Sequence, residues 1–277
     1  MKNNILSHNS ALLLGATLGL LCIAENANAA SYTTVGAEYL ETFNSGLPSS
    51  ASTPAWVDNS IIDGWYAYQT GTSSAPSNYR ITSTGSSSLA DLYQFRPSAS
   101  STDGSLGTRP ETATGNMMLG LLLTNDTGAT LTEFILGYTG EQWYESSTVQ
   151  NNQYVVSYQI GDIANLASGS WTDIDDLTFN TPHDGTGSSG QSLDGTLSAN
   201  QEVLSPVTVT DIVWEDGDSL WIRWFDANST GTDHGLAIDD VSFTAVPEPA
   251  AIGSLFGLGA LVFAGSRRNY RSKSICS

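Results

Sequence analysis

The fold is decided by a short segment near the end of the chain, Ser-Leu-Trp-Ile-Arg-Trp-Phe at residues 219–225. Side chains of a β-strand alternate between two faces, so the even-numbered residues from Leu220 to Trp224 share one face and the odd-numbered ones from Trp221 to Phe225 share the other. Both faces carry large apolar groups. This predicts a central strand whose outer face is covered by a loop.

The rest of the middle of the chain shows the same alternation. Short apolar runs are separated by loops rich in Gly and Ser, such as residues 83–88 and 185–190. We expect strands at residues 39–43, 65–68, 79–82, 92–95, 117–123, 131–138, 153–160, 203–213, 219–225 and 236–244. No segment here has helical periodicity, and no repeat of about 40 residues indicates a propeller. The sequence therefore predicts an all-β, two-sheet sandwich in one domain, residues 30–245.

The first residues have the features of an export signal. Lys2 precedes an apolar stretch over residues 11–24, and the triplet Ala-Asn-Ala that ends at Ala29 has small residues where signal peptidase reads the chain. We expect signal peptidase to cut before Ala30. Residues 1–29 would then be a signal peptide, and the rest of the chain would be secreted.

The last residues form a tail of three parts. Its motif residues are Pro247, Glu248 and Pro249, followed after an apolar stretch over 250–265 by Arg267 and Arg268. As a transmembrane helix this stretch would be about 24 Å long, slightly less than a hydrocarbon core of about 30 Å, and the arginines can reach the interface. Positive charge after the span places the end of the chain in the cytoplasm.

This order of Pro-Glu-Pro, short span and arginine cluster resembles the PEP-CTERM sorting signal. The resemblance implies that residues 246–277 are a sorting signal, that an exosortase cuts it, and that the inner membrane holds the protein only transiently. It also implies a Gram-negative bacterium that makes exopolysaccharide, and a final location at the cell surface or in the extracellular matrix of a biofilm. The alternative is a plain membrane anchor in which Pro-Glu-Pro occurs by chance.

Composition excludes several classes of function. The chain has 28 acidic and 9 basic residues and a net charge of -19, so it disfavours nucleic acid and attracts divalent cations. All acidic residues except Glu25 and Glu248 lie between the two ends. Both cysteines, Cys22 and Cys276, lie in the ends, so the middle has no disulfide, catalytic thiol or cysteine-bound metal.

The last expected strand poses an electrostatic problem. Along residues 236–244, Asp239 lies on one face and Asp240 on the other, so a carboxylate is buried whichever face is inside. A buried carboxylate without a partner is costly. It therefore needs a cation.

Segments at the two ends of the domain indicate which cation could pair with this carboxylate. Residues 40–44 (Leu-Glu-Thr-Phe-Asn) with Gly-Trp at 64–65, and residues 220–226 with 235–243, resemble the first and last strands of secreted jelly rolls of the MAM and carbohydrate-binding-module type. The resemblance implies a jelly-roll sandwich with a structural Ca²⁺. Its implied ligands are Glu41 and Asp239, with Asp240 and Asn44 as helpers. The alternative is a buried ion pair of Arg223 with Asp239 or Asp240.

Aromatic residues indicate binding. The residues considered are Trp56, Trp65, Tyr66, Tyr68, Trp143, Tyr144, Trp171 and Trp214. Most of them are explained by core packing, but an exposed ring can stack on a sugar. We expect Trp143, Tyr144 and Trp171 to be the glycan-binding ones, because acidic residues flank them and provide hydrogen bonds.

No sequence motif indicates catalysis. His183 and His234 lie in loops rich in Gly and Asp, and Asp233 next to His234 is expected to form a polar turn. We therefore expect a secreted, non-catalytic surface or matrix protein whose partners are signal peptidase, an exosortase and exopolysaccharide. A carbohydrate-binding module is the first alternative. A polysaccharide hydrolase is the second, because paired catalytic carboxylates need not be close in sequence.

Overall fold

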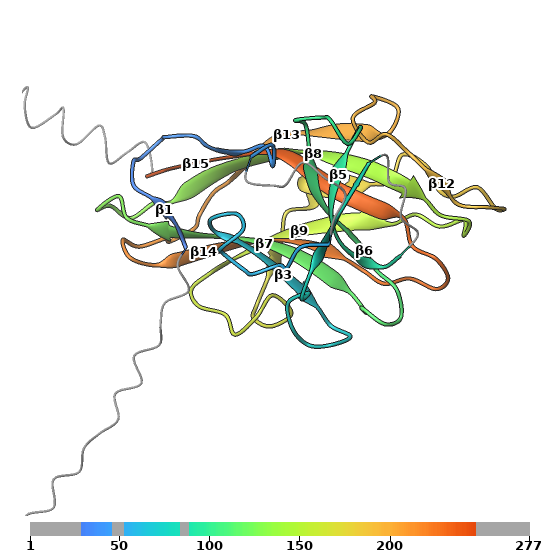
Figure 1. The fold of residues 1–277 in the computed structure, drawn as a ribbon. Coiled ribbons are helices and arrows are strands. Elements are labelled where there is room, and N and C mark those ends of the chain that lie inside the picture. The colour runs from blue at the N-terminus through green and yellow to red at the C-terminus, as the bar shows by residue number, and fades with distance from the viewer. Residues whose placement is uncertain (1–28, 46–52, 84–88, 248–277) are drawn as a thin grey trace, which may run out of the picture.

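The computed structural model describes residues 29–45, 53–83 and 89–247, which form a sandwich of two β-sheets (Figure 1). The predicted all-β, two-sheet architecture is confirmed. The one helix among these residues is a short 3-10 turn, η1 (Asp175–Leu177). None of the described helices is long and apolar enough to cross a membrane. The expected signal peptide up to residue 28 and the apolar stretch over 250–265 lie outside the described residues.

The first sheet, called sheet A, contains β14 as its central strand. Its members are β1 (Ala30–Tyr32), β3 (Trp65–Gln69), β7 (Met117–Asn125), β9 (Gln153–Ile160), β10 (Thr172–Asp173), β11 (Phe179–Asn180) and β14 (Ser219–Asp226). The order is β1-β7-β14-β9-β10, with β3 also on β7 and β11 also on β9. Trp224 of β14 lies opposite Leu119 on one side and Val156 on the other. The prediction of a central strand from residues 219–225 is confirmed.

The second sheet, called sheet B, is built around the long pair β8 and β15. Its members are β2 (Tyr39–Glu41), β4 (Tyr79–Ser83), β5 (Asp91–Arg96), β6 (Ser105–Arg109), β8 (Glu133–Glu145), β12 (Gln191–Ser192), β13 (Gln201–Val209) and β15 (Gly235–Val246). The order is β12-β8-β15-β6-β5-β4, with β13 on β8 and β2 on β15. The register of β8 and β15 shifts between Asp239 and Ser242, where Asp240 has a φ of 49°. This bulge turns the strand locally.

Aromatic side chains join the two sheets in the core. Trp224 of β14 stacks on Trp65 of β3 with ring centroids 5.5 Å apart, and it meets Tyr138 of β8 edge-on at 5.8 Å. All three rings are buried. Large buried rings contribute both area and oriented contacts. The core between the sheets therefore fixes which face of β3 and β14 remains outside.

Tyr32 ties the beginning of the described chain to its end. Its Oη donates to the carbonyl oxygens of Ala37 at 2.7 Å and Ala245 at 3.1 Å, and it accepts from the Ala245 N–H at 2.9 Å. Tyr32 is buried. Strands β1 and β15 therefore meet at one end of the sandwich (Figure 1).

Candidate functional site

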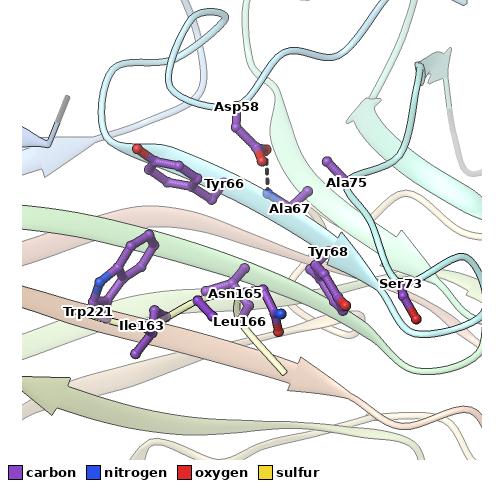
Figure 2. Close-up of a pocket in the computed structure, with 11 residues that line it drawn as sticks. Asp58, Tyr66, Ala67, Tyr68, Ser73, Ala75, Ile163, Asn165, Leu166 and Trp221 are labelled. Atoms are coloured by element: carbon purple, nitrogen blue, oxygen red, sulfur yellow. Dashed lines mark hydrogen bonds between the residues drawn. The ribbon is translucent and has the colours of Figure 1, made fainter. Parts of the chain in front are cut away.

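A cleft lies on the outer face of sheet A, on the side away from the core (Figure 2). Its volume is about 380 Å³, within the usual range of about 300–1,000 Å³ for small-molecule sites. Tyr66 and Tyr68 of β3, Trp221 of β14 and part of the loop that follows β9 line it. The figure shows Tyr66 and Tyr68 leaving the same strand, with Trp221 across from Tyr66.

Strand alternation places these rings outside. In β3, Trp65 and Ala67 belong to the core, so Tyr66 and Tyr68 point the other way and are only half-buried. Trp221 alternates with the core residues Leu220 and Ile222 of β14 in the same manner. The outer face of sheet A thus gathers aromatic groups from strands that are far apart in the sequence.

The loop over residues 161–171 covers part of this outer face. Its Leu166 packs onto Gly120 of β7, where an added Cβ would lie 2.5 Å from Leu166 Cδ2. Leu166, Trp221 and Tyr66 belong to one apolar cluster. The predicted covering loop is therefore present, and glycine at position 120 allows it to approach the sheet closely.

Arg223 fastens this loop. Its guanidinium lies 4.1 Å from the ring centroid of Trp171, and it donates from Nη1 to the Leu166 carbonyl at 3.0 Å and from Nε to Ser157 Oγ at 3.1 Å. Burial lowers the pKa of Arg223 to about 10. The alternative ion pair of Arg223 with Asp239 or Asp240 is wrong, because Arg223 is on the outer face of sheet A and both aspartates are in β15 of sheet B.

Several polar side-chain atoms in the cleft are available to form hydrogen bonds with a ligand. Asp58 Oδ1 accepts from Trp56 Nε1 at 2.6 Å and from the Ala67 N–H at 2.9 Å, and burial raises the pKa of Asp58. The cleft atoms without a hydrogen-bond partner in the described part of the chain are Asp58 Oδ2, Asn165 Nδ2, Tyr66 Oη, Tyr68 Oη and Trp221 Nε1. Donors and an acceptor beside apolar rings can bind sugar hydroxyls while the rings stack on sugar C–H groups.

None of the three expected glycan-binding residues is among those that line the cleft in the described part of the chain. Trp143 is 0% exposed, stacks on Phe95 at 5.4 Å and donates to Glu141 Oε2 at 2.7 Å, so it offers no ring face to a ligand. Tyr144 is half-buried with the Arg109 guanidinium 4.2 Å from its ring centroid. Trp171 is half-buried beneath Arg223, on the same outer face as the cleft.

Three of the expected calcium ligands accept hydrogen bonds from nearby backbone N–H groups. Asn44 Oδ1 accepts from the Gly104 N–H at 2.8 Å, and Glu41 Oε1 accepts from the Phe43 N–H at 2.7 Å. Asp239 Oδ1 accepts from the Asp240 N–H at 2.8 Å. Within residues 29–45, 53–83 and 89–247, no three His, Cys, Asp or Glu side chains are arranged to hold a metal ion. Calcium binding stays a prediction.

Asp239 instead has Glu141 as its neighbour. Burial, with Glu141 as the largest charge effect, raises the pKa of Asp239 to about 9, and burial raises that of Glu141 to about 7. Asp103 and Asp240 add smaller effects in the same direction on both groups. Glu141 is thus the acid with the largest charge effect on Asp239, and the strand pattern did not single it out as a ligand.

Asp233 and His234 form a buried network rather than a surface turn. Both are 0% exposed, and Asp233 Oδ1 accepts from Gln150 Nε2 and Asn152 Nδ2, each at 3.1 Å. His234 Nδ1 accepts from the Ser146 N–H at 3.0 Å, which leaves the ring proton on Nε2, 3.0 Å from the Gln150 carbonyl oxygen. Burial lowers the pKa of His234. Asp233 and His234 therefore join the segment before β15 to the segment over residues 146–152.

The expected sorting motif falls mostly beyond the described residues. Pro247 follows β15 directly, whereas Glu248, Pro249, Arg267 and Arg268 lie outside the described ranges. A family model of the PEP-CTERM protein-sorting motif matches residues 245–268. The chain therefore carries this motif at its C-terminal end.

Comparisons with whole proteins give similarity in structure but not in sequence. No curated protein matches the sequence of this chain. Similar solved structures include the CBM22-2 xylan-binding domain of Paenibacillus barcinonensis Xyn10C, at 11% identity and a TM-score of 0.38 over 75% of this chain and 99% of that one. They also include the K3 cleaved adhesin domain of Lys-gingipain from Porphyromonas gingivalis, at 13% identity and a TM-score of 0.41 over 75% and 99%.

A further similar structure is the enzymatically active domain of tailspike protein 4 from bacteriophage CBA120. The identity is 12%, the TM-score is 0.33, and the match covers 68% of this chain. It covers only 20% of the tailspike chain.

Proposed function

We propose that this protein is an exported, non-catalytic protein of the cell surface or extracellular matrix that binds polysaccharide in the cleft on sheet A. The cleft carries the proposal. Tyr66, Tyr68 and Trp221 provide rings for stacking, and Asp58 and Asn165 provide hydrogen-bonding atoms that the fold does not use.

The binding test uses the secreted protein and a panel of insoluble and soluble polysaccharides. Replacement Tyr68→Ala removes one ring from a half-buried position at the edge of the cleft. We expect it to weaken retention by roughly tenfold to a hundredfold, since burying a large apolar side chain against a ligand contributes about 1.5–3 kcal/mol. The matched control is Tyr144→Ala, a half-buried tyrosine on sheet B, which should keep full retention. Equal retention of the unaltered protein and both variants would refute the proposal that polysaccharide binds in the cleft.

The location rests on the PEP-CTERM motif at residues 245–268. We propose that signal peptidase removes residues 1–29, that the apolar stretch over 250–265 spans the inner membrane, and that an exosortase then releases the protein. Expression in a host with its exosortase should give a shortened extracellular form. The same host without that protease should retain the protein in its inner membrane. A soluble cytosolic chain with both ends intact would contradict the proposal.

Absence of catalysis is proposed on the chemistry of the cleft. Glycosidases commonly use two carboxyl groups about 5–10 Å apart, whereas among the described residues that line the cleft only Asp58 bears a carboxyl group. The carboxyl groups of Glu141 and Asp239, which lie beside each other, are buried in sheet B. We expect no release of reducing ends when purified protein is incubated with a polysaccharide that it binds.

We also propose that the sandwich is a jelly roll. The pairing of β2 with β15, in which Glu41 lies opposite Val241, supports this topology because it brings an early strand beside the last one. Tyr32 adds a second link between the beginning and the end of the domain.

A further inference from the structure

The cleft combines aromatic rings with negative charge. Tyr66 and Trp221 meet at an interplanar angle of 65° with ring centroids 4.9 Å apart, and Tyr68 follows on the same face of β3 (Figure 2). The face of an aromatic ring carries negative potential and attracts a cation within about 6 Å of its centre. Rings gathered around one cleft therefore favour a positively charged group there.

Two carboxyl groups act in the same region. Asp58 lines the cleft with one oxygen left without a partner in the described chain. Burial, and after it the charges of Asp58 and Asp63, raise the pKa of Tyr66 to about 12. The cleft thus has a negative field in addition to its ring faces.

No basic side chain is among the described residues that line the cleft. Its polar side chains are those of Asp58, Ser73, Asn165, the two tyrosines and Trp221. Arg223 is on the same face of sheet A, but it is held by Trp171 and the Leu166 carbonyl and does not line the cleft. A cationic ligand group would therefore meet only rings, neutral polar atoms and carboxylate.

We infer that the cleft prefers polysaccharides of amino sugars whose amino groups are free and protonated. This inference rests on the proposed carbohydrate-binding function and narrows its ligand. A sugar ring would stack on Tyr66 or Trp221 while the ammonium group pairs with the rings and Asp58. The net charge of -19 would also draw a polycationic chain from solution.

Acidic and neutral polysaccharides fit less well. A uronate or sulfate group would lie beside Asp58 without any cationic side chain in the lining to pair with it. A neutral sugar could stack on the rings, but the charge of Asp58 would add nothing to its binding.

The test compares three β-1,4-linked oligosaccharides of equal length that differ only at carbon 2, with an amino, an acetamido or a hydroxyl group. The secreted protein is titrated with each at a pH that keeps the amines protonated. The amino form should bind roughly tenfold tighter than the other two, and its affinity should fall as salt is added.

Two variants with the same change of charge locate the effect. Asp58→Asn keeps an oxygen to accept from Trp56 Nε1 and the Ala67 N–H, so it removes the charge without removing the hydrogen bonds. It should abolish most of the preference for the amino form. Glu202→Gln, at an exposed position of β13 in sheet B, should preserve that preference.

Three results would overturn the inference. Equal or tighter binding of the acetamido or hydroxyl form would do so, although polysaccharide binding itself would stand. Undiminished binding of the amino form by Tyr68→Ala would mean that diffuse surface charge holds the polycation. Failure of all three oligosaccharides and of every polysaccharide in the panel would remove the proposed function as well.

Discussion

At the scale of single residues, Asp239 and Glu141 form a pair of buried acids in sheet B. A carboxyl group is buried in β15, as the alternation of residues 236–244 required, and Asp239 is 7% exposed. The bulge at Asp240 sends the next carboxyl group to the exposed side. Asp239 then lies beside another buried acid, Glu141, and not beside Arg223. The strand pattern could not reveal this neighbour, because it depends on how β8 pairs with β15.

This pair predicts a pH dependence of stability. In the unfolded chain both carboxyl groups have pKa values near 4, whereas in the folded protein they are about 7 for Glu141 and about 9 for Asp239. The folded state therefore binds more protons, and the free energy of unfolding should fall as the pH rises from about 5 to about 9. Glu141 alone would account for roughly 3 kcal/mol at about 1.4 kcal/mol per pH unit.

Urea unfolding at pH 5 and pH 9, with EDTA present, measures this difference. The control is Glu141→Gln, which keeps an acceptor for Trp143 Nε1 and removes one titrating group. Its loss of stability between the two pH values should be smaller than that of the unaltered protein. Equal losses would show that the Glu141 carboxyl titrates normally.

At the scale of elements, the loop over residues 161–171 connects the fold to the cleft. Leu166 fills the space above Gly120, and Arg223 holds the Leu166 carbonyl and the ring of Trp171. Asn165 and Ile163 of the same loop line the cleft. The position of this wall therefore depends on contacts of Arg223, which itself does not line the cleft.

Replacement Arg223→Lys should loosen this loop without unfolding the sheet. Lysine lacks the planar fork that donates to Leu166 O and Ser157 Oγ together. Loss of a hydrogen bond from a charged group costs about 1.5–3 kcal/mol, so amides of the loop should exchange with deuterium roughly tenfold to a hundredfold faster. Amides of β9 should keep their rates. Arg80→Lys, which alters the ion pair with Asp91 in sheet B, is the matched control and should leave the loop unchanged.

Strands were predictable where apolar alternation is strong. Residues 153–160 were expected as a strand and form β9 (Gln153–Ile160). Strand β6 (Ser105–Arg109) was missed because Leu106 is its only large apolar residue. Strand β8 (Glu133–Glu145) continues past the expected end at residue 138, because β15 and β12 pair with a part that contains polar residues.

The cleft was only partly predictable. Tyr66 and Tyr68 were among the aromatic residues considered from the sequence, but Trp221 was read only as part of a strand. These residues meet because β3 and β14 both pair with β7, which local periodicity does not encode. The exposure of a ring is equally invisible in sequence, and for this reason Trp143 was chosen although it is buried.

At the scale of the whole molecule, one phenol joins the beginning of the described chain to its end. Tyr32 links β1 to the end of β15 through the Ala245 N–H and carbonyl. Residue 245 is also the first residue matched by the sorting-motif model. Tyr32→Phe removes the acceptor of the buried Ala245 N–H, whereas the Ala245 carbonyl keeps the hydrogen bond from the Gly36 N–H at 2.9 Å. We expect a loss of about 1–3 kcal/mol in the free energy of unfolding. Tyr68→Phe, whose hydroxyl has no partner in the described chain, should lose little, and equal losses for both variants would contradict this role of Tyr32.

The central claim is that polysaccharide is bound on the outer face of sheet A. Hydrogen–deuterium exchange of the secreted protein, with and without a saturating amino-sugar polysaccharide, tests it most directly. The account predicts slower exchange in β3 and in residues 163–166, with no change around Trp143 and Tyr144. Protection around Trp143 and Tyr144 with none in β3 would contradict it.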